Sequence, residues 1–385
     1  MKHPRDILLG SQAASSVLPV CDHYSGVEVR MRKSLQLQAE MTQEFGACVF
    51  DVTLDCEDGA PVGGEIEHAH LVREIAGNAA PEARVAVRVH PVDHPSFESD
   101  ITLIVGSAQH KLRHVMIPKV ETVADVEAAA KALNQVGASS LPLHVLIESP
   151  AAVHRAFEIA AHPRVQSLSF GLMDFVSAHG GAIPSSGMGV LGQFTHPLVV
   201  RAKLEIASAC HAHGKVPSHC VVTEFSDLEA IKVAATKASR ELGYTRMWSI
   251  HPAQIRPVLE ALAPSDDEIE QAADLISAAR NANWAPVSHG GQLHDRASYR
   301  FFLASARTCP SNWQTFARVS RVVFRGDIMR SLIKLTVFLM CCFSFNLLMA
   351  QTSSNTKINT NTNAKKEGKS HSSAQTNAAK KNLKK

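Results

Sequence analysis

The sequence predicts an α/β protein whose eight strands and intervening helices close into a (β/α)8 barrel, followed by a C-terminal helical segment. Two observations predict this fold. Eight short apolar runs recur through residues 1–307, and nearly every run ends next to a residue suited to acid, base or metal chemistry. Side chains at the carboxyl ends of barrel strands converge on one mouth, so this repetition also predicts a single shared site.

The expected strands are short and follow one another at regular intervals. They span residues 17–20, 49–54, 85–89, 115–117, 143–147, 168–170, 216–217 and 247–250, with Val221 and Val222 near the seventh. The polar residues at or just beyond their ends include Asp22, Asp55, Glu57, Arg88, Lys119, Glu148, Asp174, His219 and His251. The intervening segments, such as residues 151–161, are expected to form the helices that connect parallel strands.

The length and the charge distribution indicate one barrel domain followed by a tail of opposite net charge. Barrels of this kind use about 250 residues, so we assign residues 1–307 of the 385 to a single domain. That domain holds 26 Lys and Arg against 34 Asp and Glu, a net charge of −8. Residues 308–385 hold 13 against 2, a net charge of +11. An acidic body argues against nucleic-acid binding, which needs clustered Lys and Arg.

The eight cysteines are predicted to be reduced thiols. None forms a CxxC pair, and several lie inside apolar runs, which is typical of a cytosolic protein and not of a disulfide framework. The first ten residues lack the apolar core of a secretory signal peptide. We therefore predict a cytoplasmic location and expect no membrane contact for the barrel.

The chain changes character after the barrel. We expect a linker at 308–328, a signal-peptide-like or membrane-like apolar segment at 329–350, and a disordered Asn, Thr, Ser and Lys-rich tail at 351–385. We favour the interpretation that residues 328–385 are a chimeric extension from an unrelated reading frame. The alternatives are a buried helix and a tail anchor, although the apolar stretch is short beside the ~20 residues of a spanning helix.

Two carboxylates directly beyond consecutive strands are the strongest chemical signal. Glu148 follows the run at 143–147, and Asp174 follows the run at 168–170. Both should face the same mouth, and two hard oxygen ligands suit Mg²⁺, which is usually held by one or two carboxylates plus substrate oxygens. The alternative is that each carboxylate caps the helix or turn that follows it.

Arg88 ends the third predicted strand and is the expected binding group for substrate. Its guanidinium would offer a planar fork to a carboxylate or to a developing enolate oxygen. A purely structural ion pair with Glu57 or Glu148 is the alternative.

The second strand closes with three carboxylates in four positions before a glycine, which include Glu57 and Asp58. Their mutual repulsion favours a cation or basic partners nearby; a solvated acidic turn is the alternative. Lys119 ends the fourth strand and could be a Schiff-base nucleophile if desolvated. Because so many carboxylates surround it, we favour an ion-paired lysine.

Other motifs carry less weight. Residues 187–192 match GxGxxG but follow Ile-Pro-Ser-Ser instead of a buried strand, so they lack the setting of a dinucleotide-binding loop. The hydrolase signatures GxSxG and HExxH do not occur.

An ordered set of motifs resembles the citrate lyase β-subunit-like branch of the HpcH/HpaI aldolase and citrate lyase family. The motifs are DCEDGAP at 55–61, RVH at 88–90, IPKVET at 117–122, LIES at 146–149, FGLMDF at 170–175, the helix from Arg201 to Gly214, WSIHPAQI at 248–255 and GGQLHD at 290–295. No single motif is diagnostic, but their order across residues 50–307 is specific.

The resemblance implies a Mg²⁺-dependent carbon-carbon lyase acting on 3-hydroxyacyl-CoA thioesters or related 2-oxo acids. It implies that Glu148 and Asp174 ligate the metal and that Arg88 steadies the carbonyl or enolate oxygen. Asp295 matches the family's late aspartate, which comes from a segment that often closes a neighbouring subunit's site. A homotrimer or homohexamer is implied in turn. Glu57, Asp58, Lys119 and His251 complete the expected catalytic and substrate-binding set.

Two departures leave the substrate open. The first strand region reads VLPVCDH in place of a Leu-Phe-Val-Pro-like strand, and His90 stands where asparagine is common. Both changes lie near the mouth, so a CoA-independent 2-oxo acid aldolase, an acyl-CoA thioesterase, and a non-catalytic metal- and oxo-acid-binding subunit of a lyase complex are alternatives.

Overall fold

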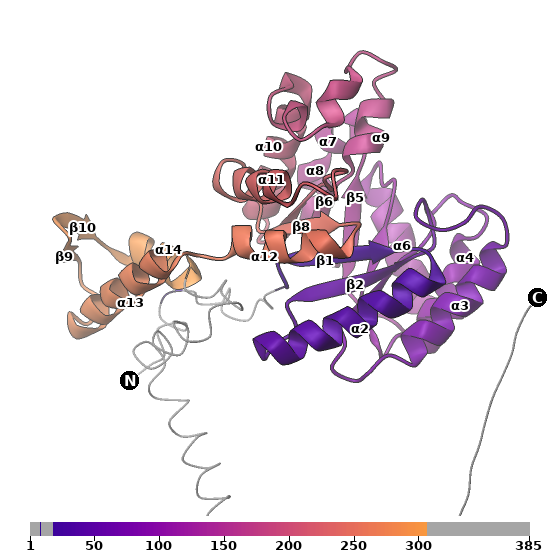
Figure 1. Cartoon of the computed structure of the whole chain (residues 1–385), viewed down its shortest axis with the longest axis horizontal. Helices are drawn as coiled ribbons and strands as arrows, with labels where there is room; N and C mark the ends of the chain where they lie inside the picture. Colours follow the sequence, from indigo (N-terminus) through magenta and orange to yellow (C-terminus); the bar gives the residue numbers. More distant parts are fainter. Residues whose placement is uncertain (1–7, 9–17, 306–385) are drawn as a thin grey trace, which may run out of the picture. The chain divides into compact units, whose positions relative to one another are not determined.

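Eight parallel strands close into a barrel in the computed structural model, which describes residue 8 and residues 18–305. Each strand pairs with the next along the chain, and β1 pairs with β8 to close the ring (Figure 1). The strands are β1 Cys21–Ser25, β2 Phe50–Asp55, β3 Val85–Arg88, β4 Leu112–Ile117, β5 Leu143–Ile147, β6 Val165–Phe170, β7 Val216–His219 and β8 Arg246–Ser249. The predicted (β/α)8 fold is confirmed.

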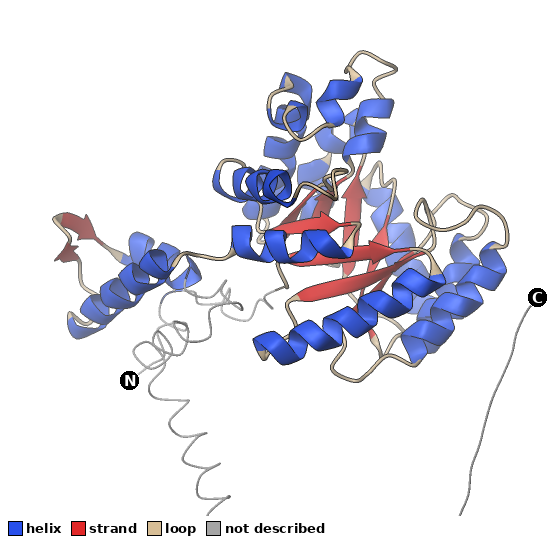
Figure 2. Ribbon diagram, viewed as in Figure 1, coloured by secondary structure: helices blue, strands red, loops and turns tan. Residues whose placement is uncertain are grey.

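Helices surround the strands, as Figure 2 shows. They are α2 Glu28–Phe45, α3 Glu65–Gly77, α4 Phe97–Asp100, α5 Gly106–Ala108, α6 Val123–Gln135, α7 Pro150–His154, α8 Ala156–Ala161, α9 Leu172–Ser177, α10 Pro197–Ala212, α11 Leu228–Arg240 and α12 Ile255–Leu262. A π-helical turn, η2 Ile101–Val105, joins α4 to α5, and three 3₁₀ turns are η3 Ser185–Met188, η4 Gly192–Phe194 and η5 Pro252–Gln254. Because helices cover the outside, the outward side chains of the strands are apolar and buried.

The barrel interior is more polar than the apolar layers usual for this fold. Alternate residues of each strand point inward. The half of the barrel near the amino ends of the strands is called the lower half. Its inward side chains are charged or imidazole groups, among them Asp22, Asp51 and Arg246. Above them an apolar and aromatic layer separates the lower half from the mouth; its members are Tyr24, Met116, Leu146 and Trp248.

Two details of the predicted strands are wrong. The sequence predicts a first strand at 17–20, whereas β1 begins at Cys21. Asp22 is expected at a strand end but is the second residue of β1 and is buried. Both errors concern β1, because a strand with polar inward-facing residues does not give an apolar run in the sequence. His219 is the last residue of β7, as predicted, and is also buried.

A C-terminal arm forms its own packed unit of secondary structure. It comprises α13 Asp266–Asn281, the hairpin of β9 Val287–His289 and β10 Gln292–His294, and α14 Arg296–Ser305. Leu275, Tyr299 and Leu303 are buried between its elements. The predicted C-terminal helical segment is therefore present.

The predicted linker at 308–328, the apolar segment at 329–350 and the polar tail at 351–385 lie outside the described residues. In the described part of the chain, no helix has the length and apolar character needed to span a membrane. The five cysteines of that part are all free thiols. The GxGxxG segment lies in the turns η3 and η4, so the absence of a dinucleotide-binding setting is confirmed.

Candidate active site

A cavity of about 850 Å³ opens at the carboxyl ends of the strands. Residues from or beyond seven of the eight strands line it, and Arg88, Glu148 and Asp174 are among them. The strand-end pattern in the sequence therefore does mark one shared mouth. Asp55, Asp58 and His251 also line this cavity, whereas Glu57 and Lys119 support its wall from outside.

Glu148 and Asp174 meet in the cavity without a cationic partner. Glu148 follows β5 directly and is buried, and Asp174 lies in the first turn of α9. Burial and the nearby charge of Asp174 raise the pKa of Glu148 to about 8. Within the described residues, neither carboxylate forms an ion pair with a Lys or Arg side chain.

Glu148 is held in place by backbone contacts and is not the helix cap. The backbone N–H of Lys119 donates to Oε2 of Glu148 at 2.7 Å. Ser149 caps α7 instead, since its hydroxyl accepts from the backbone N–H of Ala152 at 3.0 Å. The carboxylate is thus oriented towards the cavity and remains available as a ligand.

Gly171 allows the two carboxylates to approach one another. It lies between β6 and α9, and a Cβ atom at this position would lie 2.4 Å from Cγ of Glu148. Any side chain here would push Glu148 away. The glycine of the FGLMDF motif is therefore required by close packing against the carboxylate.

Two oxygen donors lacking a cation fit a hard divalent ion. Burial of Glu148 and the charge of the half-buried Asp174 both disfavour the ionised form of Glu148, which is why its pKa is raised. Mg²⁺ is commonly bound by one or two carboxylates and completes its shell with water and substrate oxygens. The residues present fit such an ion, since Glu148 and Asp174 each present a carboxylate to the cavity.

Arg88 is fixed beside this pair by two other carboxylates. Its Nε and Nη2 donate to the two oxygens of Asp55 at 2.7 and 2.6 Å, and Nη1 lies 3.0 Å from Glu57. Burial opposes its charge, but the Asp55 and Glu57 carboxylates raise the pKa of Arg88 above its ordinary value. The ion pair with Glu57, which was the alternative to substrate binding, is present, and Asp55 is an additional partner that the sequence did not indicate.

Lys119 forms the ion pairs that the sequence favoured. Its ammonium pairs with Glu57 and, at 3.5 Å, with Asp58. Although burial opposes the charge, the Glu57 hydrogen bond and the nearby carboxylates raise the pKa of Lys119. A Schiff-base nucleophile must be neutral, so this environment does not favour that role. The backbone of Lys119 has a positive φ of 52°, the conformation in which its N–H reaches Glu148.

His251 and Asp295 occupy different places. His251 is exposed on the cavity wall, its ring stacked on Phe225 at 5.0 Å between centroids. Asp295 lies in the C-terminal arm, where its carboxylate accepts from the backbone N–H of Ala297 at 2.8 Å at the start of α14. It does not line the cavity, so one chain does not bring it to the predicted site.

Several cavity residues were missed by the sequence analysis. Tyr24 stacks on Trp248 at 4.4 Å between centroids, and Arg88 lies 5.6 Å from the Tyr24 ring. Arg30 and Lys33 reach the cavity from α2. Trp248 could have been predicted because it lies in the WSIHPAQI motif at the end of a strand. Arg30 and Lys33 lie on a helix, so the pattern of polar residues at strand ends did not indicate them.

A (β/α)8 barrel whose mouth is lined by two carboxylates and a fixed arginine has the arrangement of an enzyme active site. The particular family follows from sequence comparison. The model of the HpcH/HpaI aldolase/citrate lyase family matches residues 36–252. The chain belongs to this family, and it is therefore an enzyme of the lyase class.

Individual relatives agree with this assignment. A citrate lyase subunit beta-like protein from Deinococcus radiodurans is 32% identical over 275 residues, which cover 68% of this chain and 88% of the relative. An L-malyl-CoA/beta-methylmalyl-CoA lyase from Cereibacter sphaeroides is 29% identical over 279 residues, covering 67% and 87%. The crystal structure of a citrate lyase from Burkholderia xenovorans is 44% identical with a TM-score of 0.70, covering 83% of this chain and 96% of that one.

A more distant structure shows the fold alone. Protein CitE of Mycobacterium tuberculosis, solved in complex with magnesium, acetoacetate and coenzyme A, is 20% identical with a TM-score of 0.56. It covers 76% of this chain and 98% of that one.

Proposed function

We propose that this enzyme cleaves the carbon-carbon bond of a 3-hydroxyacyl-CoA, of the citryl-, malyl- or citramalyl-CoA type, into an acyl-CoA and a 2-oxo acid in a Mg²⁺-dependent reaction. The observation that carries the proposal is the unpaired couple of Glu148 and Asp174 beside Arg88 in one cavity. The names of the malyl-CoA lyase and citrate lyase relatives support the thioester substrate.

Glu148 and Asp174 would hold the ion. When bound, Mg²⁺ supplies Lewis acidity that polarises the carbonyl oxygen and offsets the charge of the enolate. Glu148 needs its carboxylate form for this task. Its buried position and its hydrogen bond from Lys119 fix where that carboxylate points.

Arg88 is placed to stabilise negative charge on the substrate. Cleavage of a bond β to a carbonyl leaves an enolate, and a preorganised cation lowers its free energy without reorientation during the reaction. Asp55 and Glu57 contact all three guanidinium nitrogens and hold the plane of Arg88 fixed in the cavity wall, and the second N–H of each Nη is left for a substrate oxygen. In this proposal Glu57 and Asp58 position Arg88 and Lys119, and Lys119 acts through Glu148.

The remaining roles depend on assembly. His251 would contact the substrate from the exposed cavity wall. Asp295 would handle the proton of the 3-hydroxyl group in a homotrimer or homohexamer whose arm reaches a neighbouring mouth. The reverse aldol step then balances: the hydroxyl loses a proton, the carbon-carbon bond breaks, and the enolate carbon takes up a proton.

Cavity size supports a thioester over a free acid. About 850 Å³ is far more than a four-carbon oxo acid fills, and side chains such as Phe225, Ile250 and Val29 make part of the wall apolar. Ligand sites usually bury most of their ligand's surface. The excess space suits the pantetheine arm of CoA.

The test measures 2-oxo acid release from citramalyl-CoA, malyl-CoA and citryl-CoA by the full chain. We expect release that depends on Mg²⁺, stops with EDTA, and is lost in the Glu148→Gln and Asp174→Asn proteins. Glu260→Gln changes an exposed carboxylate paired with Lys232 and should keep full activity. Full turnover by the Glu148→Gln protein would overturn the assignment.

The same assay separates the competing functions. Free thiol without 2-oxo acid identifies a thioesterase. Release from free hydroxy acids but not from thioesters identifies a CoA-independent aldolase. Mg²⁺ and oxaloacetate binding without turnover of any substrate identifies a binding subunit.

A further inference from the structure

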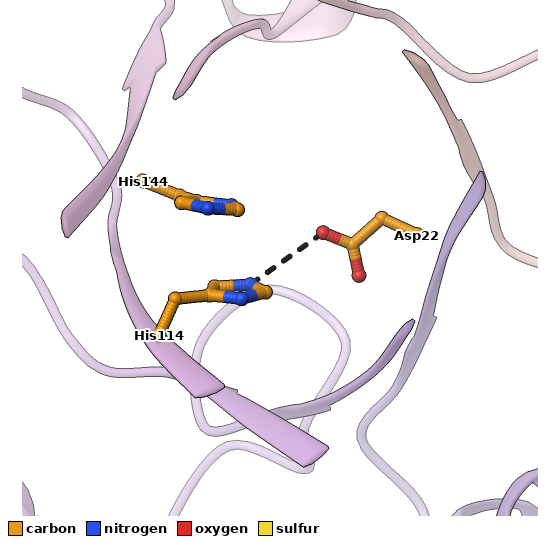
Figure 3. A group of neighbouring side chains, drawn as sticks. All are labelled: Asp22, His114 and His144. Atoms are coloured by element: carbon orange, nitrogen blue, oxygen red, sulfur yellow. Dashed lines mark ion pairs between the residues drawn. The ribbon is translucent and has the colours of Figure 1, made fainter. Parts of the chain in front are cut away.

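A second cluster of ligand-type side chains lies inside the barrel, below the mouth. Asp22 of β1, His114 of β4 and His144 of β5 are almost fully buried, and one potential ligand atom from each lies within 4.8 Å of the others. Figure 3 shows the carboxylate pointing across the barrel towards the two imidazoles. His144 lies four residues before Glu148 on the same strand, roughly 13 Å at the rise of a β-strand, so the two clusters are separate.

Potential ligand atoms of this cluster lack hydrogen-bond partners. Both ring nitrogens of His114 and Nδ1 of His144 have no hydrogen-bond partner among the described residues. Oδ2 of Asp22 pairs with Arg246 at 2.7 Å and lies 3.6 Å from Nε2 of His114. Buried polar atoms are nearly always satisfied, so this gathering of unsatisfied atoms indicates a missing ligand.

Outer contacts already orient two of the three side chains. Nε2 of His144 contacts Oε1 of Gln166 at 3.0 Å, which leaves Nδ1 as the nitrogen with the free lone pair. Thr53 donates to Oδ1 of Asp22 at 2.7 Å, which leaves Oδ2 facing the cluster. Metal-binding histidines and carboxylates are typically held by such partners on their other atoms.

The charges beside the cluster are paired. Arg246 pairs with both Asp22 and Asp51, and Arg84 also pairs with Asp51. Two arginines therefore balance the two carboxylates. The two imidazoles would be the main ligands of a cation, which would share the Asp22 carboxylate with Arg246.

We propose that Asp22, His114 and His144 form a second metal site in the lower half of the barrel, for a borderline divalent cation such as Zn²⁺. Imidazole nitrogens select Zn²⁺ and its neighbours over Mg²⁺, which prefers oxygen ligands. Ligands of a tetrahedral Zn²⁺ lie about 3.4 Å apart at bond lengths of about 2.0–2.1 Å. The 3.6 Å between Asp22 and His114 agrees with this spacing.

Binding requires one rearrangement. The rings of His114 and His144 are stacked, with centroids 3.5 Å apart and planes 11° from parallel, so their lone pairs do not yet converge. Rotation about the soft terminal torsion of one imidazole would bring them together. The ion would then join β1, β4 and β5 at the end of the barrel that stabilises the fold and not at the catalytic mouth.

The test is zinc binding by the full chain, purified without a metal-affinity column. After equilibrium dialysis against micromolar Zn²⁺, elemental analysis should find one equivalent bound. The mouth variant Glu148→Gln with Asp174→Asn should retain it, and His114→Leu with His144→Leu should lose at least nine tenths. Added Zn²⁺ should raise the unfolding temperature of the unsubstituted protein and leave that of the double-leucine protein unchanged.

A milder variant keeps the test decisive if the double-leucine protein does not fold. Gln166→Leu leaves all three ligands in place but removes the outer partner of His144, and it should weaken Zn²⁺ binding about 10- to 100-fold. Cobalt substitution should give a spectrum of nitrogen and oxygen ligands. The proposal is overturned if no stoichiometric Zn²⁺ binds, if the histidine variants keep it, or if the cobalt spectrum shows thiolate ligation.

Discussion

Arg88 and Arg246 are two buried arginines of one barrel, and each holds two carboxylates. Arg88 pairs with Asp55 and Glu57, and Arg246 pairs with Asp22 and Asp51 at 2.7 and 2.6 Å. In both cases burial opposes the charge, and the paired carboxylates raise the arginine pKa above its ordinary value. The local chemistry of the two arginines is therefore nearly the same.

Their surroundings differ. Arg88 lines the cavity, next to the unpaired carboxylates at 148 and 174. Arg246 lies in the lower half of the barrel and also donates to the carbonyl of Pro19 at 2.7 Å. Access to the cavity, and not the strength of the ion pair, therefore separates an arginine that is placed to contact a substrate from one that is enclosed in the barrel.

The largest expected effect follows replacement of the enclosed arginine. Arg246→Met leaves Asp22 and Asp51 buried without their shared partner, and breaking such a pair costs about 3–5 kcal/mol of unfolding free energy. Urea unfolding measures the loss. Adding Asp22→Asn and Asp51→Asn to the same protein should recover part of it. A loss below about 1 kcal/mol for Arg246→Met would contradict the structural role.

Replacement of Arg88, the arginine in the cavity, should lower turnover more than it lowers stability. Arg88→Lys keeps the charge but loses the planar fork that Asp55 orients. Loss of a preorganised group at the developing charge lowers turnover about 10²- to 10³-fold. We expect a smaller change in unfolding free energy than for Arg246→Met. Steady-state kinetics and urea unfolding on the same preparations provide the comparison, which fails if turnover stays within tenfold.

A third buried cation sharpens the contrast because no carboxylate of residues 18–305 forms an ion pair with it. Lys203 is buried, donates to Gln193 at 2.8 Å, and lies 4.2 Å from the centre of the Phe194 ring. Burial lowers the pKa of Lys203 to about 8, against 10.5 in the unfolded chain, although nearby Cys220 opposes the shift. We expect Lys203→Met to increase the unfolding free energy at pH 7 by about 1–3 kcal/mol, because a desolvated charge is removed.

The pH dependence of Lys203 has a definite sign. Between pH 8 and 10.5 the unfolded chain binds a proton that the folded chain has released, so the stability of the unsubstituted protein rises with pH in that window. The advantage of Lys203→Met should shrink over the same range. Urea unfolding at pH 7 and pH 10 tests this, and an equal difference at both values would refute it.

The smallest effect is expected at the surface. Arg256 contacts both oxygens of Glu44 at 3.0 and 2.8 Å, but both side chains are about half exposed. Solvent screening limits such pairs to about 0.2–1 kcal/mol, so Arg256→Ala should lower the unfolding free energy by no more than that. A loss of unfolding free energy comparable with that of Arg246→Met would show that solvent exposure does not determine how much these ion pairs stabilise the fold.

The sequence was sufficient to predict the fold because seven of the eight strands contain apolar runs. The exception is instructive. The run at 17–20 precedes β1, which itself reads Cys-Asp-His-Tyr-Ser. Its inward residues Asp22 and Tyr24 belong to a polar interior, so hydrophobic periodicity placed the strand too early.

The candidate site was predictable only in part. Arg88, Glu148 and Asp174 could be predicted because each lies at or just beyond the end of an apolar run, and side chains at the carboxyl ends of barrel strands face the mouth. This pattern did not reveal that Asp55 holds Arg88, nor that Arg246 holds Asp22 and Asp51. Those pairs join strands whose register is set by barrel closure, and Asp22 and Arg246 are 224 positions apart in the sequence. Roles that depend on a second subunit, such as that of Asp295, remain predictions.

Gly171 has a practical consequence for altering the enzyme by mutagenesis. Because any Cβ there would overlap Glu148, a randomised library should leave codon 171 unchanged, and even alanine would act as an indirect substitution of the carboxylate. Diversity is better directed to Phe225 and Ile250, which line the same cavity and have 56% and 45% of their surface exposed. Those two positions offer a route to new acyl groups at little cost in folding yield.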